Sequence, residues 1–202
     1  MYSPSQAVLP TDGFEANDKL TGGLADHLSR VSPAFRFDRM ESDALPRILT
    51  SIRALVKQVD DAVGSILDAL DIDRSLIFFT SDHGDFGGHR GLFTKVPWIP
   101  FDDLIRVPFV VSGGALAGRP RVSQTLVQNS SLAATCLDYA GVRCPDDAFD
   151  FPSLRNVLEG TDDQGDDRAI FSSFSAGYPM VRRGQFKLIC TMKPDVNLFD
   201  MD

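Results

Sequence analysis

Side chains that can bind ions lie close together in one glycine-rich window of the sequence, residues 80–95, which reads TSDHGDFGGHRGLFTK. Asp82 and His83 are adjacent, and a carboxylate beside an imidazole can coordinate a hard or borderline divalent cation. His89 follows in the same window, and Lys95 adds a compact positive charge that suits an anionic group. The window therefore indicates a site for a metal ion and an anion.

The same residue types also allow a less specific interpretation. An Asp-His pair after a strand often serves as a structural cap or supports another group, and a lysine in a loop is commonly only solvated. Glycines at 84, 87 and 88 would let the backbone pass close to a ligand, because glycine has no side chain to obstruct it. On residue types alone, a binding site and a structural loop both remain open.

The elements that must position this window begin with an apolar run at 76–79, which has the length of a strand. A run that is apolar throughout fits a buried parallel strand better than an edge strand. The Asp-His pair then lies where the strand ends, and ligands of open α/β sheets bind at that end. A second strand is expected at 107–111, edge or bulged because of Pro108, and a third at 122–127.

Helices are expected on either side of these strands. Apolar residues at steps of three and four predict a long amphipathic helix, with its face formed by Ile48, Ile52, Leu55, Val59, Val63, Ile66 and Leu70. Asn129 or Ser130 can cap a second helix, which runs through Tyr139 and stops at Gly141. The alternation of helices and apolar strands predicts a three-layer α/β sandwich. Short strands at 169–174, 180–183 and 185–191 predict a small antiparallel β subdomain after it.

Composition limits the class of protein. A chain of 202 residues can form one domain with a small appendage, and 43% hydrophobic with 24% charged residues is typical of a folded protein. The net charge of −8 disfavours nucleic acid as a partner. No apolar run approaches the roughly 20 residues that span a bilayer. The N-terminus does not resemble a signal peptide, so we expect a soluble protein and favour the cytoplasm.

Three further features carry expectations of a structural kind. Cys136, Cys144 and Cys190 form no C-x-x-C pair, which predicts reduced, partly buried thiols. The stretch 146–167 holds eight acidic residues and one basic residue, and it is expected to be a solvated loop because its spacing does not fit a calcium-binding loop. Residues 1–45 show no sustained periodicity and are expected to be irregular, with one short helix.

Beyond these patterns, residues 47–145 resemble the C-terminal half of the sulfatase catalytic domain, within the alkaline-phosphatase-like superfamily. The resemblance is carried, in order, by SILDAL, LIFFTSDHGD, GGHRGLFTK, IRVPFVVSGG and LVQNSSLAATCLDYAGV. FPSLRNVLEG and the tail MVRRGQFKLI…NLFDMD are also similar to that family. The resemblance implies a partial three-layer sandwich at 46–145, an irregular, pocket-lining insert at 1–45, and an acidic linker with the start of a β subdomain at 146–202.

The resemblance also implies roles for single residues. Asp82 and His83 match the pair that completes a divalent metal site, usually for calcium, with manganese or magnesium as alternatives. Lys95 matches the lysine that contacts sulfate or phosphate oxygens, and His89 matches a histidine near the pocket that can touch substrate. By contrast, Arg106 is expected to make a structural ion pair. A surface position is expected for His27, which lies in the irregular segment.

The sequence departs from the family in what it lacks. It contains neither C-x-P-S-R nor S-x-P-S-R, the motif whose first residue becomes the formylglycine nucleophile, nor the Asp-Asp pair that supplies the first metal ligands. We therefore expect a fragment of a metal-dependent sulfuric ester hydrolase, inactive by itself, that takes a small anionic ester. A phosphonate monoester or phosphodiester hydrolase, or an inactive truncated protein, is the alternative. Expected partners are the missing N-terminal half or further copies of the chain.

Overall fold

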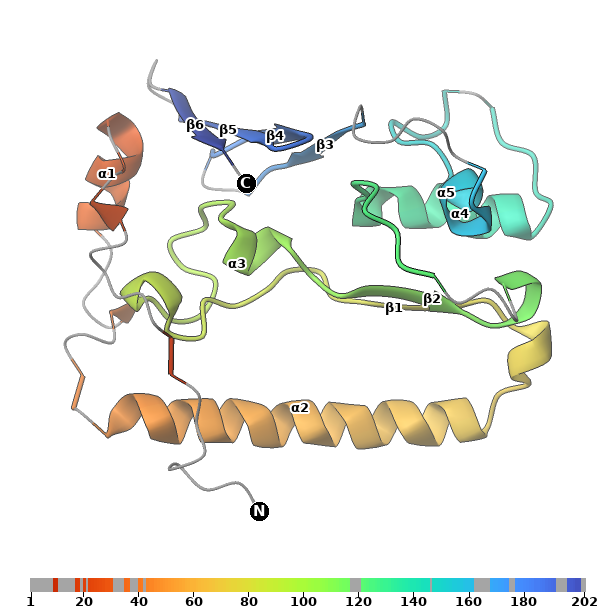
Figure 1. Cartoon of the computed structure of the whole chain (residues 1–202), viewed down its shortest axis with the longest axis horizontal. Helices are drawn as coiled ribbons and strands as arrows, with labels where there is room; N and C mark the ends of the chain where they lie inside the picture. The colour runs from red at the N-terminus through yellow and green to blue at the C-terminus, as the bar shows by residue number, and fades with distance from the viewer. Residues whose placement is uncertain are drawn as a thin grey trace.

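In the computed structural model, the described residues are 9–10, 17–18, 20, 22–30, 35–36, 40–41, 43–116, 121–145, 147–161, 168–174, 177–191 and 196–200. Figure 1 shows a long helix below a two-stranded sheet, two helices above that sheet, and a separate four-stranded sheet. The helix, sheet and helices form the three layers of the predicted sandwich. Most of the 1–45 segment lies outside the described residues.

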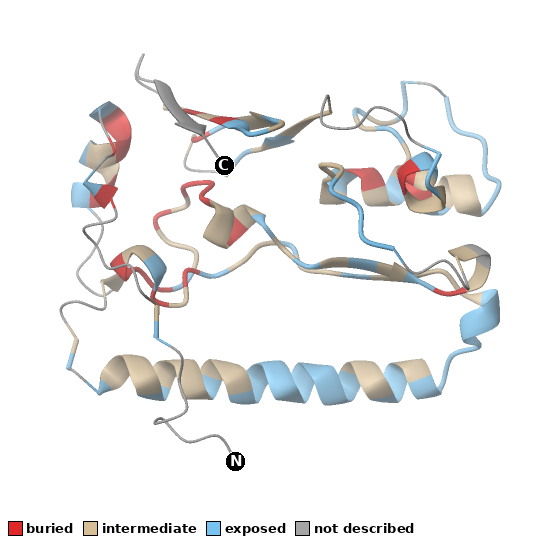
Figure 2. Ribbon diagram, viewed as in Figure 1, coloured by how far each residue is buried: buried red, intermediate tan, exposed pale blue. Residues whose placement is uncertain are grey.

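The lower layer is one helix, α2 (Ala44–Asp68), which confirms the predicted amphipathic helix and extends it toward the N-terminus. A short 3₁₀ turn follows it at Ile72–Arg74. None of the 25 residues of α2 is buried. Leu55 and Ile66, which belong to its apolar face, are 61% and 59% exposed. Figure 2 shows the middle of this helix as its most exposed part.

The middle layer pairs β1 (Ile77–Thr80) with β2 (Phe109–Ser112) in an antiparallel register that places Phe78 opposite Val111. The prediction of a buried parallel strand at 76–79 was wrong in this respect. An apolar run shows only that a strand can be covered on both faces, and it does not specify the direction of its neighbour. The strand predicted at 122–127 was also wrong, because that segment runs without a partner strand.

The upper layer contains α4 (Leu132–Tyr139) and α5 (Arg155–Glu159). The predicted second helix is confirmed, but neither expected cap holds, because a 3₁₀ turn precedes α4 and no side chain caps it. Helix α5 lies inside the acidic stretch that was expected to be a solvated loop. Its Arg155 donates to Asp138 at 3.0 Å and to Glu159 at 3.0 Å, which ties the stretch to α4. Asp146 and residues 162–167 lie outside the described part.

The predicted β subdomain is confirmed as an antiparallel sheet of order β3-β4-β5-β6. Its strands are β3 (Ala169–Ser172), β4 (Met180–Arg183), β5 (Phe186–Cys190) and β6 (Val196–Asp200). Cys190 is half-buried, whereas the other two cysteines are exposed rather than partly buried, and all three thiols are free. Within the described residues, no helix combines the length and apolar character that a membrane span requires.

The core of the chain lies around the loop that follows β1, not around α2. It joins α1 (Gly22–Ser29), this loop, the short helix α3 (Asp102–Ile105) and the C-terminal sheet. Its buried side chains are Leu20, Leu24, Leu28, Phe86, Leu92, Ile99, Phe101, Leu104, Tyr178, Met180 and Ile189. Among the described residues, the loop that carries the predicted site is therefore at the centre of this buried cluster.

Candidate active site

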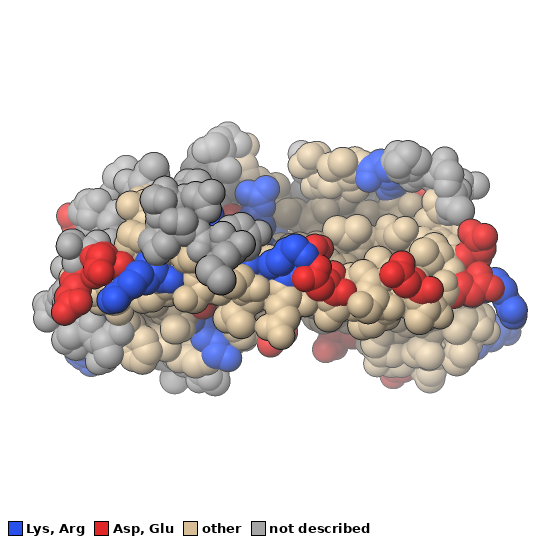
Figure 3. Space-filling model, turned by 90° about the horizontal axis from the view of Figure 1, so that it is seen from below, with Lys and Arg blue, Asp and Glu red and all other residues tan. Residues whose placement is uncertain are grey.

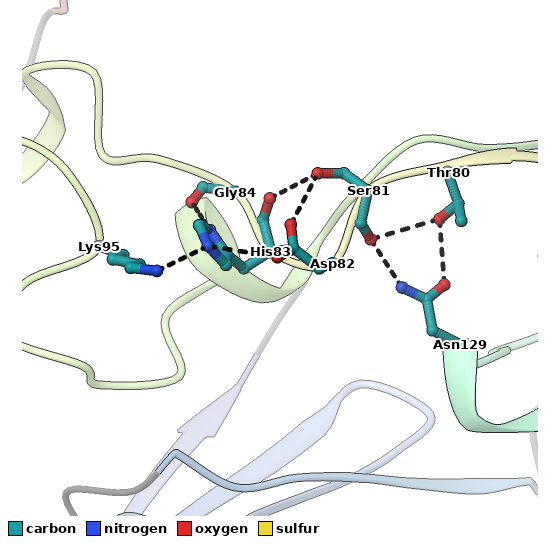
Figure 4. Close-up of polar contacts among 7 residues, drawn as sticks. All are labelled: Thr80, Ser81, Asp82, His83, Gly84, Lys95 and Asn129. Atoms are coloured by element: carbon teal, nitrogen blue, oxygen red, sulfur yellow. Dashed lines mark hydrogen bonds and ion pairs between the residues drawn. The ribbon is translucent and has the colours of Figure 1, made fainter.

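Asp82 and His83 lie just beyond the end of β1, in a turn made by their own side chains and backbone (Figure 4). Ser81 Oγ donates to the carbonyl oxygen of His83 at 2.8 Å, and the backbone N–H of His83 donates to Asp82 Oδ1 at 2.9 Å. A side chain that bonds the backbone in this way fixes a local turn without a helix or a strand. The Asp82 side chain itself is 85% exposed.

Asn129, which precedes α4, holds the end of β1 from the other side. Its Nδ2 donates to the Ser81 carbonyl oxygen at 2.6 Å, and its Oδ1 accepts from Thr80 Oγ1 at 3.0 Å. The sequence suggested Asn129 as a helix cap, but this amide instead fixes the strand end that leads into Asp82. Sequence reasoning missed this role because the two segments meet only in the fold.

The contacts of His83 show which of its ring nitrogens can accept a hydrogen bond. Its Nδ1 lies 2.8 Å from the Gly84 carbonyl oxygen, and since a carbonyl only accepts, Nδ1 carries the proton. The lone pair is then on Nε2, which lies 3.2 Å from Lys95 Nζ and 3.6 Å from Asp82 Oδ2. The lone pair that receives the Lys95 ammonium is the one a metal ion would use. Three of the four predicted site residues therefore converge.

The sequence suggested that Gly84 lets the backbone pass close to a ligand, but the structure shows a different reason for the glycine. A Cβ at this position would lie 2.0 Å from the Asp103 carbonyl oxygen, and the Gly84 N–H donates to the Leu104 carbonyl oxygen at 2.8 Å. The glycine lets the loop after His83 pack directly on the backbone of α3. This close approach anchors the site to the buried core.

Within the described residues, Lys95 forms no ion pair with a carboxylate. The nearby acids that could compete are engaged elsewhere: Asp102 with Lys187 at 2.5 Å and with Arg182 at 3.6 Å, and Asp103 with Arg90 at 3.7 Å. The Lys95 ammonium instead lies against His83 and 4.9 Å from the centre of the Trp98 ring. A lysine charge held this way is available to an anion.

The electrostatics around Asp82 favour its charged form. The hydrogen bond from the His83 backbone N–H is the largest cause that lowers the pKa of the Asp82 carboxyl, and the positive charge of Lys95 lowers it further. Desolvation acts in the opposite direction and is outweighed. Asp82 is thus an anion at neutral pH, as a cation ligand must be.

Asp82 also borders a hollow of about 550 Å³ between α3, the 124–130 segment and β3–β4. Arg106, Arg182 and Asn129 line the same hollow, but His83 and Lys95 do not. Of the Asp82-His83 pair, only Asp82 therefore borders this hollow. Arg106 makes no ion pair with a described carboxylate, contrary to the structural pair expected for it.

The two remaining histidines lie elsewhere. His89, the fourth predicted site residue, is 53% exposed, and its Nδ1 lies 3.9 Å from Asp103 Oδ1. His27 is not the surface residue that was expected: it is half-buried, with Nε2 2.9 Å from the Pro97 carbonyl oxygen. His27 connects α1 to the loop that carries Lys95.

Asp82 and His83 fit part of a divalent metal site. An ionised carboxylate and an imidazole nitrogen that carries a lone pair are both suitable ligands. Among the described residues, no group of three or more acidic, histidine or cysteine side chains could hold a metal ion. Calcium takes about six to eight oxygen ligands, so further donors must join these two.

Comparisons with known proteins give these residues a family context. The family model described as Sulfatase matches residues 10–142. The choline-sulfatase of Rhizobium meliloti is 30% identical over 159 residues, which cover 74% of this chain and 30% of that protein. The chain thus spans less than a third of this relative's length.

Solved structures show the same fold. The phosphonate monoester hydrolase of Agrobacterium radiobacter aligns with a TM-score of 0.74 and 22% identity, over 99% of this chain and 46% of that one. A protein solved in complex with its substrate D-glucosamine-2-N,6-O-disulfate aligns with a TM-score of 0.61 and 21% identity, over 91% of this chain and 42% of that one. The described elements therefore form part of an alkaline-phosphatase-like fold.

Proposed function

The chain belongs to the sulfatase family, and we propose that it supplies one half of the active site of a metal-dependent sulfuric ester hydrolase. The observation that carries this proposal is the convergence of Asp82 Oδ2 and Lys95 Nζ on His83 Nε2. A carboxylate, an imidazole lone pair and an ammonium group in contact match the needs of a cation and an anionic ester together.

Asp82 and His83 would hold a divalent metal, with calcium as the first choice and manganese or magnesium as alternatives. When bound, such an ion polarises the ester oxygens as a Lewis acid. The residues themselves are prepared for it: Asp82 is ionised, and the Gly84 carbonyl oxygen fixes the His83 ring so that Nε2 keeps its lone pair. Orientation of a metal-binding imidazole by a second hydrogen bond is common in metal sites.

Lys95 would neutralise the negative charge on the ester, and preorganised charge of this kind is worth about 3–4 kcal/mol of transition-state stabilisation. The ammonium donates to the His83 lone pair that a metal would also use. Both cannot use that lone pair at once. Lys95 is therefore expected to leave His83 and contact the anion when a metal is bound. For His89, the proposed role is limited to contact with substrate.

The proposed partner is the N-terminal half of the catalytic domain, whether joined to this chain or separate. β1 pairs only with β2 among the described strands, and the apolar face of α2 is exposed. A sheet edge and an apolar helix face of this kind need cover. Relatives are more than twice as long, and the formylglycine motif is absent from these 202 residues. A second copy of the chain is the alternative partner.

A phosphonate monoester hydrolase is the second candidate function. The alignment to that enzyme from Agrobacterium radiobacter spans nearly the whole chain with a TM-score of 0.74. Identity of 22% supports a shared fold and does not favour one ester over the other. The residues near the nucleophile would separate the two activities.

The test is to complete the domain and compare esters. The probe is the part of the Rhizobium meliloti choline-sulfatase that precedes its matched region, fused to this chain and assayed with calcium on an aryl sulfate and an aryl phosphonate monoester. The proposal predicts turnover of the sulfate that Asp82→Ala removes, with Asp60→Ala on α2 as a matched control. A fusion that folds and cleaves only the phosphonate ester supports the second candidate. Sulfate turnover that survives Asp82→Ala contradicts the proposed site.

A further inference from the structure

Lys95 begins a tight and strained turn. The Trp98 N–H donates to the Lys95 carbonyl oxygen at 2.9 Å, which closes the turn over residues 95–98. Thr94 and Trp98, at either end, have φ values of 61° and 66°, a left-handed conformation that residues other than glycine seldom adopt. Such conformations persist only where the surroundings hold them, and they gather at functional sites. The surroundings of this turn therefore require an explanation.

The first support comes from α1. His27 Nε2 lies 2.9 Å from the Pro97 carbonyl oxygen, so Nε2 donates to the middle of the turn. The His27 ring packs on Tyr178 from the C-terminal subdomain, with 5.0 Å between ring centres. Pro97 is fully buried and Tyr178 nearly so. A hydrogen bond between segments 70 residues apart thus fixes the backbone that follows Lys95.

The second support is a pair of aromatic contacts. The Trp98 ring lies 4.9 Å from Lys95 Nζ and 6.2 Å from the ring of Phe174, which follows β3. An ammonium group within about 6 Å of an indole face is attracted by the ring quadrupole. Trp98 therefore holds the Lys95 charge on one face while Phe174 packs against it from the C-terminal subdomain.

We propose that His27 and Trp98 are positioning residues for Lys95, which direct its ammonium toward His83 and connect α1 and the C-terminal subdomain to the anion site. This proposal rests on the role proposed for Lys95 above. Neither residue is placed at the reacting atoms. His27 acts on the backbone of the turn and Trp98 acts on the ammonium, so loss of either frees Lys95 to leave the site.

Trp98 is the only tryptophan, so its fluorescence reports directly on this contact. Iodide, an anionic quencher, is drawn to a nearby ammonium group, whereas neutral acrylamide is not. The ratio of their quenching constants therefore measures how close Lys95 lies to the ring. In the full chain at low salt, Lys95→Met should lower this ratio by about twofold, because a unit charge within a Debye length biases the local iodide concentration.

His27→Ala should lower the ratio to the value of Lys95→Met. His27→Gln should keep the wild-type ratio, because the neutral glutamine amide can still donate to the Pro97 carbonyl oxygen. Ser29→Ala, on an exposed position of α1, is the matched control and should change nothing. Phe174→Leu should lower the ratio in part, since it removes the ring that packs on Trp98.

Two results would overturn the proposal. One is an unchanged ratio in Lys95→Met, which would show that the ammonium does not lie over the indole. The other is a wild-type ratio in His27→Ala with helix content preserved. If His27→Ala does not fold, His27→Asn serves instead, because its shorter amide keeps polarity but cannot reach the carbonyl. The measurement needs no turnover, so an inactive completed domain would refute the proposed function and leave this result standing.

Discussion

The loop that carries the site is more buried than the long helix α2, although a regular helix would ordinarily be expected to be better packed than an irregular loop. Residues 84–104 contain little regular structure, yet Phe86, Leu92, Ile99 and Leu104 are completely buried there. Helix α2 is the most regular element, about 37 Å long at 1.5 Å per residue, and none of its residues is buried. Regular backbone and tertiary packing are thus separated in this chain.

The difference follows from where each region finds its partners. The loop is covered by α1, α3 and the C-terminal sheet, all within the chain. In Figure 1, α2 lies across from β1 and β2, and two-stranded sheets are marginally stable by themselves. Figure 3, seen from the side of α2, shows charged residues along this face among many uncharged ones. The loop that holds Asp82, His83 and Lys95 is therefore packed by the chain itself, whereas α2 has no comparable cover among the described residues.

The largest expected effect tests the burial difference directly. Phe101→Ala, in the core beside the site, should lower the free energy of unfolding by about 3–5 kcal/mol, because it removes a buried aromatic ring and leaves a cavity. Leu55→Ala on α2 should change it by less than about 0.5 kcal/mol in this chain, as is usual for exposed positions. Urea unfolding followed by circular dichroism measures both.

Completing the domain should alter only one of these values. With the N-terminal half fused, Leu55→Ala should cost about 2–5 kcal/mol, the range for a buried leucine, while the cost of Phe101→Ala stays the same. Equal costs for Leu55→Ala in both contexts would mean that the added half does not cover α2.

The second effect concerns turnover. In the completed domain, Lys95→Ala should lower turnover of an aryl sulfate by about 10²–10³, as removal of one transition-state charge donor does. Lys57→Ala on α2 is the matched control, because this lysine pairs with Asp61 on the exposed helix. An unchanged rate in Lys95→Ala would exclude this residue from the mechanism.

The smallest effect concerns the ion pair between Asp102 of α3 and the buried Lys187 of β5. Lys187 is 2% exposed, and burial lowers the pKa of its ammonium although Asp102 partly opposes this. Lys187→Met should change stability at pH 7 by less than about 1 kcal/mol, because Met fills the same space and Asp102 keeps Arg182.

The pH dependence of stability shows whether burial or Asp102 has the larger effect on the pKa of Lys187. Since the folded pKa of Lys187 lies below the unfolded value of 10.5, the unfolded chain binds more protons between the two values. Wild-type stability should therefore rise relative to Lys187→Met as pH increases toward 10.5. A wild-type stability that falls relative to the variant over that window would show that Asp102 outweighs burial.

Local patterns in the sequence were sufficient for the elements that depend on them. The period of apolar residues predicted α2, and the short apolar runs predicted β4 with the bounds Met180–Arg183. The pairing of β1 was predicted wrongly, because the direction of a neighbouring strand depends on residues far away in the chain. Cys136 and Cys144 are exposed for a related reason: a residue type states a preference for burial, while the fold decides it.

The candidate site shows the same division. Asp82, His83 and Lys95 were identified from spacing and from the family resemblance, and they do converge. The residues that hold them were missed, because Asn129 and His27 lie 48 and 70 residues from the atoms they contact. No spacing rule connects positions that distant. A helix cap was the best local explanation for Asn129, and the structure replaces it with a tertiary contact.

We propose that these 202 residues hold the metal-binding and anion-binding half of a hydrolytic site and not its nucleophile. Turnover of an aryl sulfate by the purified chain alone, with calcium or manganese added, tests this proposal. We expect a rate no higher than that of the Asp82→Ala, His83→Ala double variant, because the covalent step needs a nucleophile and the formylglycine motif is absent from these 202 residues. A rate clearly above that of the double variant would show that the site is complete in this chain and that the proposal is wrong.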